Sequence, residues 1–392
     1  MFTLASPRPM RKFELEVFLS EWEFKASYHM TASDVQSMSV HDLLALGCAE
    51  DQSAFEQLSL GYTETWGAPP LRAEIASTYD GMEAENVLCL AGAGEGLYAV
   101  SRVLLDPSSH AIVPVPNYQS AETVPLSICE VTGIPIRRSD VKGGWRIDLQ
   151  DIKAAIRANT RLLSLNFPHN PTGLLMSRSD LDKLISICRA RGIWILSDEV
   201  YRGIELNPED RMPQMADLYE RGISLNVMSK AYGLPGLRIG WIACQDISLL
   251  EKVERYKHYL SICNSAPAEA LALIALRSRG TILRRNHELV LKNAAALDRL
   301  FGDFPGLVEW KRPLGGCVAF PRYTGPGNVE AFCRSLLEDS GVLLLPASIY
   351  GSELAETPTD HFRIGFGRGP VFDDGVKAMR HHFEAAYSHF AR

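Results

Sequence analysis

Between about residues 87 and 244, short apolar runs alternate with segments of helical periodicity, and this alternation constrains the fold more than any other feature. The seven runs are VLCLAG (87–92), AIVPVP (111–116), VTGIPI (131–136), RLLSLNF (161–167), IWILSD (193–198), ISLNVMS (223–229) and RIGWIAC (238–244). Most are apolar at successive positions, which is typical of strands covered by helices on both faces. We therefore expect an α/β domain with a mostly parallel sheet of about seven strands.

The intervening segments carry a helical pattern. In residues 177–192 the apolar face comprises Leu181, Leu184, Ile185 and Cys188, and Gly192 ends the segment. After residue 245 a long helical stretch runs from about 265 to 302, followed by short strands and a terminal helix from about 371. We expect an N-terminal segment (1–45) that joins the small domain, a large α/β domain (46–285) and, after a long bridging helix, a smaller α+β domain (286–392).

Composition narrows the class of protein. The net charge of −7 over 392 residues argues against a nucleic-acid or anionic-membrane partner, and no apolar run approaches the length needed to span a bilayer. Charges interrupt the first apolar run, so we expect no secretory peptide. The eight cysteines form no C-x-x-C pair and the ten histidines no H-E-x-x-H motif, which favours reduced thiols over disulfides or a metal site. The sequence predicts a cytoplasmic enzyme without a metal ion.

Chemistry-bearing residues follow the predicted strands. Parallel sheets bind ligands beyond the carboxyl ends of their strands. The segment LNVMSKAYGLPGLRIGW places Lys230 after a strand, with Arg238 eight residues later. A lysine in apolar surroundings beside a cation can lose its proton near neutral pH, as bonding to a carbonyl carbon requires. The alternative interpretation is a solvated surface lysine.

A glycine-rich turn lies between a strand and a helix in LCLAGAGEGLYAV. Backbone N–H groups at such a helix start bind phosphate, and Gly92, Ala93 and Gly94 are the candidates. The alternative is a dinucleotide-binding turn, but the spacing is G-x-G-x-G rather than G-x-G-x-x-G.

Several strings together resemble one family. They are S-K-x-x-G-x-x-G-x-R at 229–238, N-P-T-G within NFPHNPTG, D-E-x-Y within ILSDEVY, and Y-x-x-x-x-G-x-x-x-L-R within GYTETWGAPPLRAEIA. They are similar to the motifs of the class I/II aminotransferases, which depend on pyridoxal 5′-phosphate (PLP) and share PLP fold type I of the aspartate aminotransferase superfamily. The resemblance covers nearly the whole chain. It implies a large domain with a mostly parallel seven-stranded sheet and a smaller α+β domain.

The resemblance implies roles at the cofactor. Lys230 would hold PLP as a Schiff base and act as the catalytic base, while Asp198 would keep the pyridine nitrogen protonated. Tyr201 and Asn170 would donate to the ring oxygen, and Tyr118 would stack on the ring. The alternatives are a helix N-cap for Asp198, a plain Asn-Pro turn for Asn170 and a core tyrosine for Tyr118.

Further residues complete the expected site. Arg238 would bind the phosphate. The family usually has Ser or Thr where Val227 stands, so Ser229 would have to compensate. Tyr62 would reach the phosphate of the neighbouring subunit, which implies a homodimer with shared active sites. Arg363 in HFRIGFGR would grip the substrate carboxylate as a bidentate fork, the alternative being an exposed strand arginine.

The N-terminal segment LSEWEFKASYHMTASDVQSMSVHDLLAL resembles the capreomycidine synthase-like branch, whose members act on arginine derivatives. We expect this segment to fold over the active site, with Glu23, Asp34 or both facing a cationic substrate end. An acid between two aromatics, as in WEF, would strengthen such a pair. The alternative is a solvated helix face for Glu23 and a cap for a helix beginning near Val35 for Asp34.

Three functions remain open from the sequence. The leading one is amino-group transfer between an L-amino acid and a 2-oxo acid. The second is PLP-dependent elimination, cyclisation or oxidation of an arginine-like amino acid. The third, a PLP-binding sensor without catalysis, is disfavoured because the chain is acidic and shows no added DNA-binding domain.

Overall fold

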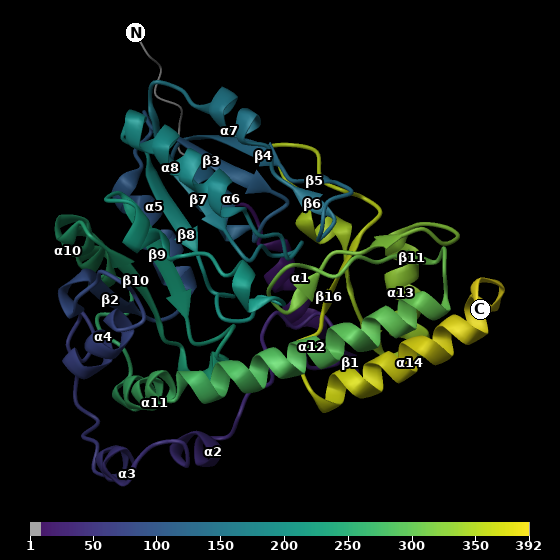
Figure 1. Ribbon diagram of the computed structural model, residues 1–392, viewed down its shortest axis with the longest axis horizontal. Helices are drawn as coiled ribbons and strands as arrows, with labels where there is room; N and C mark the ends of the chain where they lie inside the picture. The colour runs from purple at the N-terminus through teal and green to yellow at the C-terminus, as the bar shows by residue number, and fades with distance from the viewer. Residues whose placement is uncertain (1–8, 392) are drawn as a thin grey trace.

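The computed structural model describes residues 9–391 and contains a central seven-stranded sheet (Figure 1). Its order is β2 (Val87–Leu90), β10 (Gly240–Cys244), β9 (Gly222–Val227), β8 (Trp194–Asp198), β7 (Thr160–Asn166), β3 (His110–Val115) and β4 (Glu130–Pro135). Strand β10 is antiparallel to both neighbours, and every other pair in this sheet is parallel. All seven apolar runs lie in the sheet, so the predicted fold class is confirmed.

Helices cover both faces of this sheet, which explains why its strands are apolar at successive positions. In β2, Leu88 and Leu90 pack with α5 (Ala93–Leu104) and α10 (Ile247–Lys257). The alternate residues Val87 and Cys89 pack with α4 (Pro69–Ala76) and α11 (Ala266–Arg277). Farther along the sheet, α8 (Arg178–Arg191) buries its four predicted apolar residues, and Gly192 ends it with φ +64°.

The remaining helices and strands of this half are short. They are α2 (Val40–Leu44), α3 (Ala49–Glu56), α6 (Ser120–Leu126), α7 (Leu149–Ala155), α9 (Met215–Leu218), β5 (Arg137–Arg138) and β6 (Trp145–Arg146).

The C-terminal part forms a second, smaller arrangement of helices and strands. The helices are α12 (Arg279–Asp303), α13 (Val329–Ser340) and α14 (Pro370–Ala386). The strands are β11 (Val308–Glu309), β12 (Val318–Ala319), β13 (Arg322–Tyr323), β14 (Val342–Leu343), β15 (Leu345–Pro346) and β16 (Phe362–Gly365). Helices α12 and α14 run side by side at its edge (Figure 1).

This region differs from the sequence prediction in the continuity of its long helix. The helical stretch predicted from about 265 to 302 is two helices, α11 and α12, separated at Ser278, whose hydroxyl donates to the carbonyl of Leu46. The domain boundary expected at 285/286 falls within α12 and stays a prediction. No helix among residues 9–391 combines the length and apolarity that crossing a membrane requires.

The N-terminal segment joins the two halves. Helix α1 (Glu14–Trp22) lies against the loop that precedes α6, where Gln119 accepts from the backbone N–H of Glu14 at 2.9 Å. Strand β1 (Tyr28–His29) then pairs in parallel with β14. Residues 30–36 continue along the C-terminal strand β16, because Gly365 donates to Met30 and Gln36 to Gly367 through the backbone.

Candidate active site

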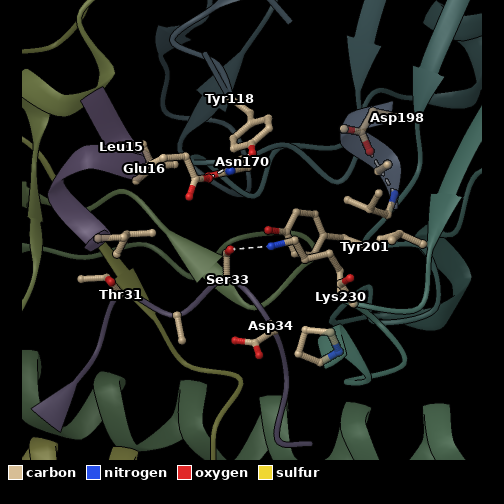
Figure 2. Close-up of a pocket in the computed structure, with 18 of the residues that line it drawn as sticks. Leu15, Glu16, Thr31, Ser33, Asp34, Tyr118, Asn170, Asp198, Tyr201 and Lys230 are labelled. Carbon is tan, nitrogen blue, oxygen red and sulfur yellow. Dashed lines mark hydrogen bonds between the residues drawn. The ribbon is translucent and has the colours of Figure 1, made fainter. Parts of the chain in front are cut away.

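The carboxyl ends of the parallel strands open into a cavity of about 400 Å³. Its lining includes most of the predicted site residues: Glu23, Asp34, Ala93, Gly94, Tyr118, Asn170, Asp198, Tyr201, Ser229, Lys230, Arg238 and Arg363. Helix α1 and the segment after β1 supply the opposite wall, so that Glu16 and Thr31 lie across the pocket from Asp198 (Figure 2). The cavity therefore lies where the large sheet, the smaller C-terminal part and the N-terminal segment meet.

Lys230 follows β9 by three residues and is partly buried. Its Nζ donates to the hydroxyl of Ser33 at 2.7 Å (Figure 2). Burial lowers the pKa of Lys230; the carboxylate of Asp34 opposes this change, and the guanidinium of Arg363 adds to it. The position and the lowered pKa suit an amine that must be available unprotonated, and they disfavour the surface-lysine interpretation.

Asp198 is the last residue of β8 and is 9% exposed. Burial raises the pKa of its carboxyl to about 6, although a hydrogen bond from the backbone N–H of Val200, at 3.2 Å, opposes the rise. The alternative of a helix N-cap is wrong, because a turn rather than a helix follows this strand. A cationic partner placed beside Asp198 would favour its ionised form.

Tyr201 lies in that turn and is 2% exposed. Its hydroxyl forms no hydrogen bond of normal geometry in the described part of the chain, although buried hydroxyls are normally paired. Burial raises the pKa of Tyr201, and the nearby hydroxyl of Ser33 opposes the rise. The neighbouring Asn166, which the sequence reasoning missed, ends β7 and donates to the carbonyl of Asp198 at 3.0 Å. It also accepts from the backbone N–H of Asn170 at 2.8 Å. Its position as a polar residue at a strand end was the signal that could have identified it.

At the predicted phosphate-binding turn, the backbone of Gly92 lies close to the side chain of Arg238. Gly92 has φ +104°, and a Cβ there would lie 2.6 Å from Nη2 of Arg238, so glycine is required. Helix α5 begins at Ala93 without a side-chain cap, so its first backbone N–H groups have no partner within the helix. Arg238 Nη1 is 3.4 Å from the hydroxyl of Ser229. A helix start, a guanidinium and a hydroxyl thus converge where an anion would bind.

Arg363 lies on β16 and is 1% exposed, which contradicts the alternative of an exposed strand arginine. Its Nη1 donates to the amide oxygen of Asn170 at 3.1 Å and to the hydroxyl of Tyr350. Its Nη2 donates to the carbonyl of Thr31 at 2.6 Å. The buried Nε has no partner in the described chain, so this guanidinium keeps the capacity to bind a further acceptor.

Tyr118 lines the cavity and is partly buried rather than enclosed in the core. Its ring lies 5.1 Å from that of Phe13, and its hydroxyl donates to Glu16 at 3.1 Å. Burial, and then the carboxylate of Glu16, raise the pKa of Tyr118. Helix α1 therefore holds this ring at the cavity wall.

Both predicted N-terminal acids line the cavity, but their surroundings differ. Asp34 is 8% exposed, but both its oxygens accept hydrogen bonds from Arg368, at 3.1 and 3.2 Å, so this carboxylate already has an ion-pair partner. No helix begins near Val35, because the next helix, α2, starts at Val40 with Ser39 as its cap. Glu23 reaches the cavity edge, yet Phe24 is 93% exposed and does not help to enclose it.

The structure places two predicted residues outside this lining. Gly92 lies directly behind it, against Arg238. Tyr62 is 93% exposed and lies in a separate shallow depression with residues 263–267. Its expected role requires a second copy of the chain and stays a prediction.

Sequence reasoning also missed part of the polar wall of the cavity. The missed residues are Glu16, His29, Thr31, Ser33 and Arg368. They come from the N-terminal segment and from the loop after β16, and no motif marks them. Burial, followed by the charge of Arg368, lowers the pKa of His29 to about 4, so its imidazole is neutral near pH 7.

The residues present fit PLP. The unpartnered hydroxyl of Tyr201 suits a phenolic ring oxygen, and the buried Asp198 suits a ring N–H. The Gly92–Arg238 approach at the start of α5 suits a phosphate, and Lys230 suits an aldehyde carbon. No group of three or more His, Cys, Asp or Glu side chains within residues 9–391 is arranged to hold a metal ion.

Comparisons with known proteins give a consistent result. The profile of the family described as aminotransferase class I and II matches residues 41–370. Capreomycidine synthase from Streptomyces vinaceus is 30% identical over 390 residues, covering 96% of this chain and 94% of that protein. Arginine–pyruvate transaminase from Pseudomonas aeruginosa is 31% identical over 339 residues, 81% of each chain. A crystal structure of a PLP-dependent aminotransferase from Streptococcus suis is similar with a TM-score of 0.89 and 29% identity, covering 98% of this chain and 100% of that one.

Proposed function

Because this chain belongs to the class I and II aminotransferase family, we propose that it transfers an amino group between an L-amino acid and a 2-oxo acid. It is an enzyme of the PLP-dependent superfamily with PLP fold type I. The observation that carries the proposal is the convergence of Lys230, Asp198 and Arg363 on one cavity at the strand ends. These three groups meet the distinct needs of covalent attachment, ring protonation and carboxylate binding.

PLP, when bound, supplies an aldehyde that bonds covalently to amines and a ring that withdraws electrons from the substrate Cα. In our proposal Lys230 would hold the cofactor through Nζ, and its free amine would take up a proton from the substrate Cα. Asp198 stabilises the protonated ring nitrogen, and Tyr201 and Asn170 donate to the ring oxygen. The ring of Tyr118 limits movement of the cofactor ring.

Binding groups hold the two charged ends of the reactants. Arg238, Ser229 and the backbone N–H groups of Gly92, Ala93 and Gly94 bind the phosphate in this proposal. Arg363 binds the α-carboxylate of the substrate, with its orientation fixed by Asn170 and Tyr350. The walls from α1 and residues 29–34 exclude water from the reacting atoms, because they cover the cavity opposite the sheet.

A second candidate is a diverted reaction of an arginine-like amino acid, such as elimination, cyclisation or oxidation. The similarity to capreomycidine synthase over 96% of the chain favours it. The acids Glu16 on α1 and Glu23 at its C-cap also favour a cationic substrate, because neither forms a salt bridge within residues 9–391. With Asp34 paired to Arg368, we assign recognition of the cationic end to Glu16 and Glu23 rather than to Asp34.

The experiment that separates the two candidates measures both products of the reaction. Purified protein with PLP is incubated with arginine-like, acidic and aromatic amino acids, each with and without a 2-oxo acid. Stoichiometric conversion of the 2-oxo acid to its amino acid supports transfer. Turnover of the amino acid that is independent of the 2-oxo acid supports the diverted reaction.

A further inference from the structure

A hydroxyl from the N-terminal segment contacts the amine of Lys230. Nζ of Lys230 donates to Oγ of Ser33 at 2.7 Å, a contact between residues 197 positions apart (Figure 2). Within residues 9–391, this is the one hydrogen bond that Nζ of Lys230 forms. No sequence motif marked Ser33, and neither the cofactor nor the substrate contacts proposed above assign it a role.

The segment that carries Ser33 is fixed on both sides. Before it, the carbonyl of Thr31 accepts from Arg363 at 2.6 Å, and after it both oxygens of Asp34 bind Arg368. Glycines permit this close approach: a Cβ at Gly365 would lie 2.0 Å from the carbonyl oxygen of Ala32, and one at Gly367 would lie 2.4 Å from that of Asp34. Ser33 is therefore held in place before any ligand binds.

The adjacent Asp34 does not replace the hydroxyl as an acceptor for Lys230. Its two oxygens are occupied by the guanidinium of Arg368, whereas Oγ of Ser33 lies directly on Nζ. An amine that takes up a proton gains hydrogen-bonding capacity, and an acceptor at a fixed point favours that charged form and sets its direction. Without such an acceptor, a lysine retains rotamer freedom about four bonds.

We propose that Ser33 is a positioning residue that holds the free amine of Lys230 in the orientation from which it exchanges a proton with the substrate Cα. This inference rests on the proposed function, since it assigns Lys230 the proton transfer. Ser33 itself takes no part in the bond changes. The proton moves between the substrate Cα and Nζ of Lys230, so a Cα–H bond breaks as an N–H bond forms, and the reverse.

The experiment begins with the cofactor-free protein, where the Ser33–Lys230 contact is tested apart from activity. Competitive acetylation with acetic anhydride across a pH series, read by peptide mass spectrometry, gives the titration midpoint of Lys230. Loss of the acceptor in Ser33→Ala disfavours the ammonium form, so the midpoint falls by about one pH unit, which is about tenfold more labelling at a fixed pH below it. Ser33→Thr keeps the hydroxyl and retains the wild-type midpoint. The matched control is Ser37→Ala, an exposed serine on the same segment.

The effect of each substitution on catalysis is then measured with the PLP-loaded enzymes. In Ser33→Ala, kcat falls about tenfold while KM for the amino donor changes less than about twofold, because a proton-transfer group loses its alignment without loss of a substrate contact. An unmoved midpoint in Ser33→Ala overturns the proposal, as does an equal shift in Ser33→Thr or Ser37→Ala. If Ser33→Ala does not fold, Ser33→Cys serves instead, and its weaker acceptor should give a smaller shift in the same direction. A shifted midpoint in a protein whose wild type transfers no amino group would leave the Ser33 contact standing and contradict the proposed function.

Discussion

Nη1 of Arg363 donates to the amide oxygen of Asn170 at 3.1 Å, although 193 residues separate the two positions. The contact joins β16 of the C-terminal part to the loop after β7, and both residues are buried. It brings the group expected to bind the substrate carboxylate next to a group expected at the cofactor. The proposed substrate and cofactor sites would therefore share one hydrogen-bond network.

We expect Arg363→Lys to lower kcat/KM for the amino donor by about 100-fold, because lysine keeps the charge but loses the planar fork that binds a carboxylate through two bonds. Uptake of PLP, followed by its absorbance, should stay close to that of the wild type. The matched control is Arg322→Lys, since Arg322 is an arginine of the same C-terminal part that pairs with Asp360 away from the cavity. A kcat/KM for Arg363→Lys within about threefold of the wild type would remove this residue from the substrate site.

For Asp198→Asn, the expected change concerns stability and its pH dependence. The folded-state pKa of about 6 lies above the ordinary value of 3.8, so the folded cofactor-free protein binds more protons than the unfolded chain between these values. Stability therefore falls as pH rises through that window, by about 3 kcal/mol for this group. Asp198→Asn removes this loss, so the cofactor-free variant should be more stable than the wild type at pH 7 and no more stable near pH 3.

The measurement is urea unfolding of both cofactor-free proteins over a pH series, analysed as the difference between them. The same variant should bind PLP more weakly than the wild type, since the ring N–H loses its counter-ion. A stability difference that does not change with pH would show that Asp198 ionises normally in the fold. PLP affinity equal to that of the wild type would contradict its assignment to the ring nitrogen.

Glu16 should distinguish substrates by the charge of the side chain. Arginine and citrulline have nearly the same shape, but only arginine carries a guanidinium. We expect Glu16→Gln to reduce the wild-type preference for arginine over citrulline by about threefold, a modest effect because this carboxylate is exposed at the cavity edge. Glu14→Gln on the same helix is the control, since Glu14 pairs with Lys12. A wild-type preference for acidic or aromatic donors would exclude the cationic-substrate candidate.

Much of the fold followed from the sequence because strands buried on both faces leave a local signal. Each apolar run of the seven-stranded sheet is visible without knowledge of its neighbours. Asp198, Lys230 and the turn at Gly92 could be identified for a related reason: parallel strands place their carboxyl ends at one edge of the sheet.

The opposite wall of the site could not be identified in this way. Ser33, Glu16 and Arg368 line the cavity through tertiary contacts between segments 102 to 334 residues apart, from Glu16 with Tyr118 to Asp34 with Arg368. Asp34 was expected to face the substrate, and its pairing with Arg368 depends on that same packing. The exposure of Phe24 likewise depends on where the turn after α1 lies, which no local pattern specifies.

We predict a homodimer in which Tyr62 completes the phosphate site of the partner. Tyr62 is 93% exposed and lies beside Leu60, itself 83% exposed, which suits a face covered by a second copy. Tyr62→Phe and Lys230→Ala proteins, each with low activity alone, should recover activity when mixed, because hybrid dimers contain one site with both residues intact. Lack of recovery despite subunit exchange verified by mass spectrometry would count against a shared site.

The assignment of Lys230 is tested most directly by identifying the lysine that bonds PLP. The PLP-loaded protein is reduced with borohydride, digested and mapped by mass spectrometry, with Lys257 as the internal comparison, since it is also buried but hydrogen-bonds Asn264 away from the cavity. We expect the phosphopyridoxyl group on Lys230 and its loss in Lys230→Ala. A label on Lys257 or any other lysine, with Lys230 unmodified, would contradict it.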